Sequence, residues 1–285
     1  MTLPFEIVGI FGTGPGGGSP LAVVHGAEGL AAADMAWIAA RLRADEAAFV
    51  LPPTAPEATH RVRVFTRRGE SPFGGHSAVG TAVALVRSGR LPAGRVVQQC
   101  GERLLTLRAD AERATVTATG PQPADALDPG PLLEAVGLTG DDLDGGPVAA
   151  AGFGPRFHLL PVRRGAVAAA RPDPAALERA DLPDVFVFHW DAAASTATAR
   201  LFAPGYAIAE DPGCASVGLA LGAWLDARGL PGGGLAFRIE QGAELGRPAV
   251  LECTAGSGDG PLTATVGGRA PQELTGEITV PVPRP

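Results

Sequence analysis

Two glycine-containing loops in this sequence carry polar side chains of the kind that bind small acids. The first is Gly74-Gly75-His76-Ser77, and the second is Asp211-Pro212-Gly213-Cys214-Ala215-Ser216. Each loop leads into a predicted helix, whose unpaired N–H groups and dipole favour an anion such as a carboxylate. Many glycine-rich loops are plain turns. The hypothesis therefore depends on the two loops being matched, with a histidine in one and an aspartate and a serine in the other.

Glu46 is the candidate for acid/base chemistry. It directly precedes an apolar run, Ala47-Ala48-Phe49-Val50-Leu51. A carboxyl group at the edge of buried apolar surface can serve as both base and acid near neutrality. From the residue pattern alone, a solvated glutamate at the start of a strand fits equally well.

The elements that must position these residues occur twice along the chain. Arg63-Val64-Phe65 matches Arg200-Leu201-Phe202 at an offset of 137, and Val79-Gly80 matches Val217-Gly218 at 138. Gln99 and Glu102 recur as Gln241 and Glu244 at an offset of 142. A spacing this long is too great for a solenoid repeat and indicates two similar domains. We expect the chemistry to lie where the two halves meet.

Each half has the same predicted order: a strand, a loop, a helix and further strands. The helices, from Ser77 or Ala78 to Arg87 and from Ser216 to Arg228, are apolar on nearly every side, which predicts burial on nearly every side. The predicted fold is therefore α+β, with two pseudo-repeated domains, each a curved, mostly antiparallel sheet wrapped around a central buried helix. We place the domains at residues 1–120 and 121–275, and the strand-like tail 276–285 could complete the first.

Composition excludes several classes of function. The 285 residues include no lysine and no asparagine, so Schiff-base chemistry, a phosphate-loop lysine and N-glycosylation are all excluded. The net charge of −7, without a basic cluster, argues against nucleic-acid binding. No apolar run is long enough to span a membrane, the start lacks the form of a signal peptide, and the three cysteines suggest no disulfide framework. The histidines show no ligand spacing, so we expect a soluble, cytoplasmic protein without a metal site.

The order and spacing of five motifs resemble the PhzF-type isomerases of phenazine biosynthesis, which have the diaminopimelate-epimerase-like fold. The motifs cover nearly the whole chain and are residues 18–24 (GSPLAVV), 45–52 (DEAAFVLP), 65–76 (FT to PFGGH), 210–216 (EDPGCAS) and 240–248 (EQGAELGRP).

The resemblance implies a proton shift without a cofactor, in which one carboxyl group removes a proton from one carbon and returns it to another. Glu46 matches the glutamate that does this, and Asp211 matches the family's second acidic residue. His76 matches a position that lines the pocket, where it could hydrogen-bond the substrate or shuttle the proton. The implied substrate-binding residues are Gly75, Ser77, Gly213, Cys214, Ala215 and Ser216. A homodimer is implied as well. Simpler roles remain open: Asp211 as a loop or helix cap, His76 as a core or capping residue, and Ser216 as a helix N-cap.

The second loop departs from the family pattern. Ala215 stands where the family has glycine and cannot freely take a positive φ, so the loop's shape is in question. Cys214 is unusual there, and we expect it to shape the pocket rather than to carry a proton.

Three functions are compatible with these residues. The first is an isomerase of specialised metabolism that moves a double bond in a small amino or imino acid or cyclic diene. The second is an epimerase or racemase that uses two bases on one carbon. The third is a protein that binds a small acid without catalysis.

Overall fold

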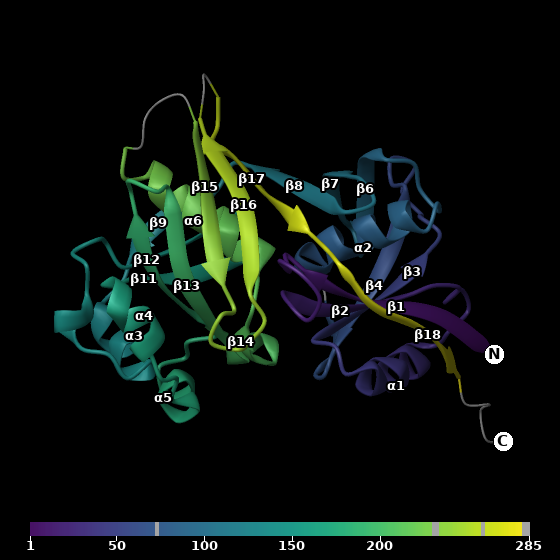
Figure 1. The fold of residues 1–285 in the computed structure, drawn as a ribbon, viewed down its shortest axis with the longest axis horizontal. Helices are drawn as coiled ribbons and strands as arrows, with labels where there is room; N and C mark the ends of the chain where they lie inside the picture. The colour runs from purple at the N-terminus through teal and green to yellow at the C-terminus, as the bar shows by residue number, and fades with distance from the viewer. Residues whose placement is uncertain (72–73, 230–233, 258–259, 281–285) are drawn as a thin grey trace. The chain divides into compact units, whose positions relative to one another are not determined.

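The computed structural model describes residues 1–71, 74–229, 234–257 and 260–280, with the side chains of His76 and Pro123 also outside the description. The chain forms two compact units (Figure 1). The first is Met1–Val116 together with Gly267–Pro285, and the second is Thr117–Val266. The chain passes from the first unit to the second within strand β8 (Arg113–Thr119) and returns within β17 (Thr263–Arg269).

The first unit is a mostly antiparallel sheet around one helix. Its elements are β1 (Thr2–Ile10), β2 (Ser19–Val24), α1 (Ala32–Leu42), β3 (Glu46–Leu51), β4 (His60–Thr66), β5 (Gly69–Ser71), α2 (Gly75–Arg87), β6 (Gly94–Cys100), β7 (Arg103–Ala109), β8 and β18 (Gln272–Thr279). The pairs β2–β3 and β4–β6 are parallel, and β18–β1, β1–β2, β3–β4, β4–β5, β6–β7 and β7–β8 are antiparallel. Helix α2 contacts β1, β2, β3, β6 and β7, so the sheet encloses it.

Helix α2 approaches the sheet closely because it carries Gly80. A Cβ atom at Gly80 would lie 2.8 Å from Leu21 Cδ2 and 3.0 Å from both Ile10 Cγ1 and Val8 Cγ2. A side chain here would force strands β1 and β2 away from the helix. This packing explains the first Val-Gly element of the repeat.

The second unit repeats this topology. Its elements are β9 (Gln122–Ala126), α3 (Pro129–Ala135), the 3₁₀ helix η1 (Gly140–Asp142), β10 (Ala149–Gly152), β11 (Arg156–Pro161), α4 (Arg164–Ala169), α5 (Pro174–Arg179), β12 (Val185–Asp191), β13 (Thr196–Ala203), the 3₁₀ helix η2 (Pro204–Tyr206), β14 (Ile208–Asp211), α6 (Ala215–Asp226), β15 (Leu235–Gln241), β16 (Ala249–Gly256) and β17. The pairs β11–β12 and β13–β15 are parallel, as are β2–β3 and β4–β6 in the first unit. Helix α6 contacts β10, β11 and β16, and a Cβ atom at Gly218 would lie 2.9 Å from Val266 Cγ2.

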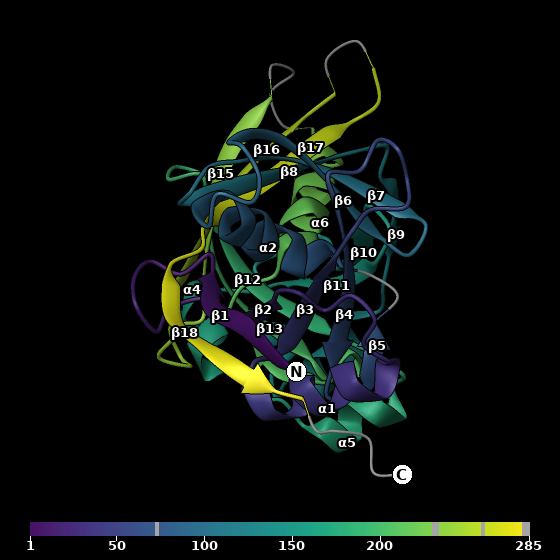
Figure 2. The same cartoon turned by 90° about the vertical axis from the view of Figure 1, so that its right-hand side faces the viewer.

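Strand β1 of the first unit and strand β10 of the second each have a second antiparallel partner. Strand β18 lies along β1, as Figure 1 and Figure 2 show, and β9 lies along β10. The strand-like tail of the sequence therefore pairs with the N-terminal strand.

The Arg-x-Phe repeat has the same structure in both units. Arg63 forms a bidentate ion pair with Glu70 at 2.7 and 2.6 Å, and Arg200 forms one with Glu210 at 2.8 and 2.8 Å. Each guanidinium also lies near the ring of the phenylalanine two residues on, with Cζ 5.4 Å from the Phe65 centroid and 4.7 Å from that of Phe202. The predicted α+β fold with two repeated units, each a sheet around a buried helix, is confirmed.

Candidate functional site

Glu46 is the first residue of β3, where the polar loop meets the buried sheet. It pairs in parallel register with Leu21 of β2, a fully buried residue. The side chain is half-buried, and its Oε2 atom is shielded from solvent. The carboxyl group thus lies at the boundary that the sequence predicted.

The loop before α2 is held by side chains of β6. Gln98 Nε2 donates to the Gly74 carbonyl at 3.0 Å, and Ser77 Oγ donates to the same oxygen at 3.3 Å. Cys100, two residues after Gln98 and so on the same face of β6, packs against Gly74: a Cβ atom there would lie 3.1 Å from its Sγ atom. Burial and the negative charges of Glu46 and Glu70 raise the pKa of the Cys100 thiol.

Behind this loop lies a buried row of hydrogen-bonded polar side chains. His60 Nε2 lies 3.2 Å from Gln98 Oε1, and Thr59 Oγ1 lies 3.1 Å from His60 Nδ1. The Gly74 carbonyl only accepts, so the Gln98 amide must turn its NH₂ group there and its oxygen towards His60. The neutral imidazole then carries its proton on Nε2. Burial lowers the pKa of His60 to about 4, which keeps the ring neutral near pH 7.

The site residues predicted in the first loop, Gly75, His76 and Ser77, lie in the first turn of helix α2. Helix α2 begins at Gly75, two residues before the predicted start, and includes His76 and Ser77. Ser77 is fully buried, and its hydroxyl donates to the Gly74 carbonyl. Its backbone N–H, rather than its hydroxyl, is therefore the group that Ser77 presents at the helix N-terminus. The side chain of His76 lies outside the described residues, as do Pro72 and Phe73 of the family motif.

Asp211 ends β14 and is 4% exposed. Its Oδ1 atom accepts a hydrogen bond from the Gly213 N–H at 2.9 Å, which closes a turn before α6. The Asp211 backbone carbonyl accepts a hydrogen bond from Gln241 Nε2. The loop-capping role of Asp211 is therefore present in the structure.

The start of α6 differs from the prediction. Cys214, which is buried, is the N-cap residue, Ala215 is the first helical residue and Ser216 the second, so the N-cap interpretation of Ser216 is wrong. None of residues 211–216 has a positive φ, and Ala215 is therefore accommodated without backbone strain. Ser216 is partly exposed at the helix N-terminus.

The motif at residues 240–248 forms a turn behind the second loop. Gly242, at φ +77°, begins the turn, and Arg247 N–H donates to its carbonyl at 2.9 Å. A Cβ atom at Gly242 would lie 2.9 Å from the Pro212 carbonyl oxygen, so glycine is required by both conformation and contact.

Sequence reasoning missed His60 and Gln98, the residues that hold the first loop. One signal was available: Gln98 is a polar residue that continues the apolar strand segment Val96-Val97. In a buried strand a polar side chain must find a hydrogen-bond partner, which indicates a structural or functional task.

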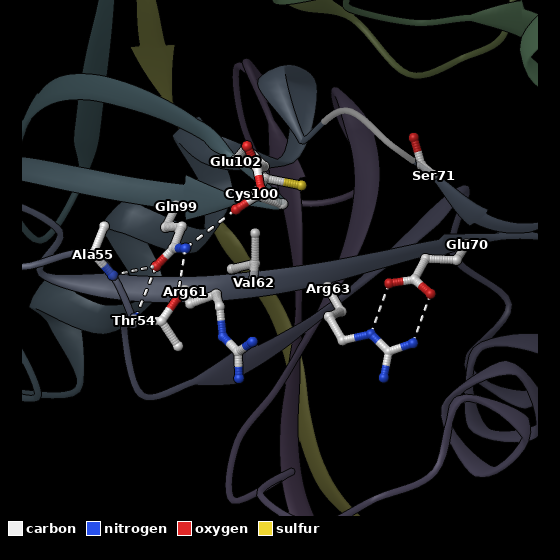
Figure 3. Close-up of a pocket in the computed structure, with 11 residues that line it drawn as sticks. Thr54, Ala55, Arg61, Val62, Arg63, Glu70, Ser71, Gln99, Cys100 and Glu102 are labelled. Carbon is white, nitrogen blue, oxygen red and sulfur yellow. Dashed lines mark hydrogen bonds and ion pairs between the residues drawn. The ribbon is translucent and has the colours of Figure 1, made fainter.

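A pocket of about 790 Å³ opens beside Cys100 in the first unit (Figure 3). Polar residues that line the pocket interact with one another. Arg63 forms an ion pair with Glu70, and Gln99 forms hydrogen bonds with Thr54 and with the Ala55 N–H.

Within the described part of the chain, no group of three or more His, Cys, Asp or Glu side chains is arranged to hold a metal ion. Among the helices described, none is long and apolar enough to cross a membrane.

Acidification is expected to destabilise the fold through His60. The folded pKa is about 4 and the ordinary value is 6.5, so the unfolded chain binds a proton more readily between these values. The stability that depends on a neutral His60 is fully present above pH 6.5. It is lost as the pH falls towards 4, and the free energy of unfolding decreases by about 3 kcal/mol in total. Urea unfolding at several pH values measures this loss. A His60→Gln variant should show a flatter pH dependence over this window, and curves parallel to the wild type would contradict the assignment.

Each unit is a sheet around a buried helix, with a glycine-containing loop before that helix. Known proteins with this fold identify the class to which the chain belongs. A solved PhzF-family protein from Bacillus anthracis superposes with a TM-score of 0.86 at 22% identity, over 98% of this chain and 100% of the other, which shows the fold. A predicted epimerase from Pseudomonas aeruginosa superposes with a TM-score of 0.79 at 27% identity, over 97% and 99% of the two chains.

The family model described as phenazine biosynthesis-like protein matches residues 8–276, and the chain belongs to this family. The trans-2,3-dihydro-3-hydroxyanthranilate isomerase of Pseudomonas aeruginosa is 29% identical over 262 residues, 90% of this chain and 91% of that protein. The protein is an enzyme, an isomerase of the PhzF-like kind.

Proposed function

We propose that the protein is a cofactor-independent isomerase that moves a double bond in a small carboxylate-bearing intermediate of specialised-metabolite biosynthesis. The substrate class is an amino or imino acid or a cyclic diene acid. The similar isomerase of Pseudomonas aeruginosa acts, by its name, on an amino acid with a dihydro ring, which supports the cyclic class.

The observation that carries this proposal is the placement of Glu46. Its carboxyl group has one oxygen shielded from solvent and lies at the start of a buried strand, within the residues that the family model matches. In the proposed reaction the carboxylate takes a proton from one substrate carbon, the double bond moves along the conjugated system, and the resulting carboxylic acid returns the proton to another carbon. One group serves as base and then as acid, so no proton is gained or lost overall.

The other candidate residues are proposed to bind the substrate and aid the transfer. The proposed substrate-binding residues are Gly75 and Ser77 at the start of α2 and Gly213, Cys214, Ala215 and Ser216 at the start of α6, because the N-terminus of a helix favours a carboxylate. The Gly213 N–H is bonded to Asp211, so this residue is proposed to line the site rather than to donate to the substrate. Asp211 and His76 are proposed to take part in proton transfer or to hydrogen-bond the substrate. We propose a homodimer, which sedimentation analysis would test.

The site of deuterium incorporation tests the proposed reaction. The protein is incubated in D₂O with trans-2,3-dihydro-3-hydroxyanthranilate and, separately, with cyclic imino acids and proline-type acids, and NMR follows each carbon. We expect deuterium at a new position: a carbon of the original double bond that carried no hydrogen in the starting acid.

Deuterium at the original carbon alone, with inversion, would instead establish an epimerase, the alternative favoured by the similarity to the predicted epimerase. Binding of these acids with neither a shift of the double bond nor exchange at any carbon would favour a non-catalytic binding protein.

A further inference from the structure

Each unit contains a buried glutamine whose side-chain amide holds the loop before the buried helix. Gln98 Nε2 donates to the Gly74 carbonyl at 3.0 Å, and Gln241 Nε2 donates to the Asp211 carbonyl. The two side chains belong to residues that are 0% and 3% exposed. Buried amide hydrogen bonds of this kind are costly to lose because the carbonyl left behind has no access to water.

The two hydrogen bonds occur at corresponding places in the repeat. At the offset of 138 that relates Gly80 to Gly218, Gly74 corresponds to position 212, one residue from Asp211. The glutamines themselves lie at different strand positions. The sequence repeat paired Gln241 with Gln99, but Gln99 Oε1 accepts from the N–H groups of Thr54 and Ala55 at 2.9 and 3.1 Å. Both units therefore have a hydrogen bond from a glutamine to the loop, although the two glutamines are not aligned in the sequence repeat.

The first glutamine is itself held in one orientation. Its oxygen faces His60 Nε2 at 3.2 Å, and His60 in turn contacts Thr59. Cys100 packs against Gly74 from the same face of β6. The Gly74 peptide is thus restrained by a side chain on its carbonyl and by packing at its Cα atom.

The second loop is restrained in a similar way. Gln241 is followed by the turn at Gly242, which lies directly against Pro212. The side chain of Asp211 bonds to Gly213 within the loop. A hydrogen bond and close packing together determine where the loop leads into α6.

The two glutamine hydrogen bonds hold these loops by their carbonyl oxygens and do not use the N–H groups at the start of the following helix. In α2 the N-cap residue is Gly74, which has no side chain to occupy those groups. Binding of a carboxylate by N–H groups depends on their direction, and this direction follows from the preceding peptides. We propose that Gln98 and Gln241 are positioning residues: each holds the loop of its own unit in the orientation in which the N–H groups of the following helix bind a carboxylate. This inference rests on the proposed function.

The test compares three leucine variants of buried glutamines. Gln98→Leu and Gln241→Leu remove the hydrogen bonds to the loops. Gln99→Leu is the control, because Gln99 is also a buried glutamine, 8% exposed, whose side-chain hydrogen bonds go to the backbone of Thr54 and Ala55 instead. Calorimetry measures the affinity for 2-aminobenzoate, a stable cyclic amino acid. Hydrogen–deuterium exchange measures protection of residues 74–80 and 211–218. Thermal unfolding shows how much stability each variant loses.

We expect Gln98→Leu and Gln241→Leu each to weaken 2-aminobenzoate binding at least tenfold, with faster exchange in residues 74–80 and 211–218 respectively. Gln99→Leu should bind within threefold of the wild type despite a comparable loss of melting temperature. Unchanged exchange in both segments, or an equal loss of affinity in Gln99→Leu, would overturn the inference. If the wild type binds none of the probe, the proposed substrate class is wrong, and the exchange comparison still decides whether the glutamines position the loops.

Discussion

Glu46→Gln is expected to reduce turnover about 10³-fold, while the variant folds and binds the substrate. The amide has the shape of the carboxyl group but can neither accept a proton from carbon nor return it, and positioned acid/base groups contribute roughly 10²–10⁴ to a rate. Initial rates with the substrate identified by the D₂O experiment give the turnover number, and calorimetry gives the affinity.

The control for this prediction is Glu70→Gln. The charge of Glu70, like that of Glu46, raises the pKa of Cys100, but Glu70 is bonded to Arg63 at the pocket wall. We expect its turnover to stay within a few-fold of the wild type, which would separate proton transfer from a general effect of negative charge. Turnover by Glu46→Gln that equals the wild type would remove Glu46 from the mechanism.

The second large effect is expected on stability, at the buried ion pair between Arg200 and Glu210. Glu210→Ala leaves the Arg200 guanidinium, in a residue that is 7% exposed, without its bidentate carboxylate. An arginine side chain stays protonated in proteins even without a carboxylate partner, so Arg200 cannot relieve its buried charge by losing a proton. The free energy of unfolding should fall by about 3–5 kcal/mol, as measured by urea denaturation.

The repeat supplies a matched control in the first unit. Arg63 and Glu70 have the same bidentate geometry, but their side chains are 27% and 42% exposed. Water can solvate Arg63 when its partner is removed, so Glu70→Ala should cost less than about 1 kcal/mol. Equal losses in the two variants would show that burial of the ion pair is not the cause.

The same local motif has different surroundings in the two units. Both units use an arginine, a glutamate and a phenylalanine to join a strand to its hairpin partner. In the second unit Arg200 also donates to the Ala170 carbonyl at 2.8 Å, which ties the pair to the segment after α4. We expect the difference in burial, together with this extra hydrogen bond, to determine how much stability each unit loses.

The sequence was sufficient to predict the architecture because the relevant signals are local. The repeated Arg-x-Phe and Val-Gly elements revealed the duplication, and helices that are apolar on nearly every side had to be buried. The abrupt change from Asp45-Glu46 to an apolar run placed Glu46 at the start of a buried strand, where the structure has it.

The helix starts were predicted less well. Helix α2 begins at Gly75 rather than at Ser77 or Ala78, and Cys214 rather than Ser216 is the N-cap of α6. In both units the loop before the helix accepts a hydrogen bond from a glutamine, Gln98 or Gln241, on a strand that follows later in the chain. Local propensity contains no information about such restraints.

The amino-acid sequence by itself determined which segments are buried, that the fold is made twice, and which carboxyl group borders the core. Only the tertiary structure decided which polar side chains meet. His60 and Gln98 are 38 residues apart and come together because β4 and β6 pair in parallel, in a register that packing of the whole sheet on α2 selects. A hydrogen bond between distant residues depends on that register, and no spacing along the chain encodes it.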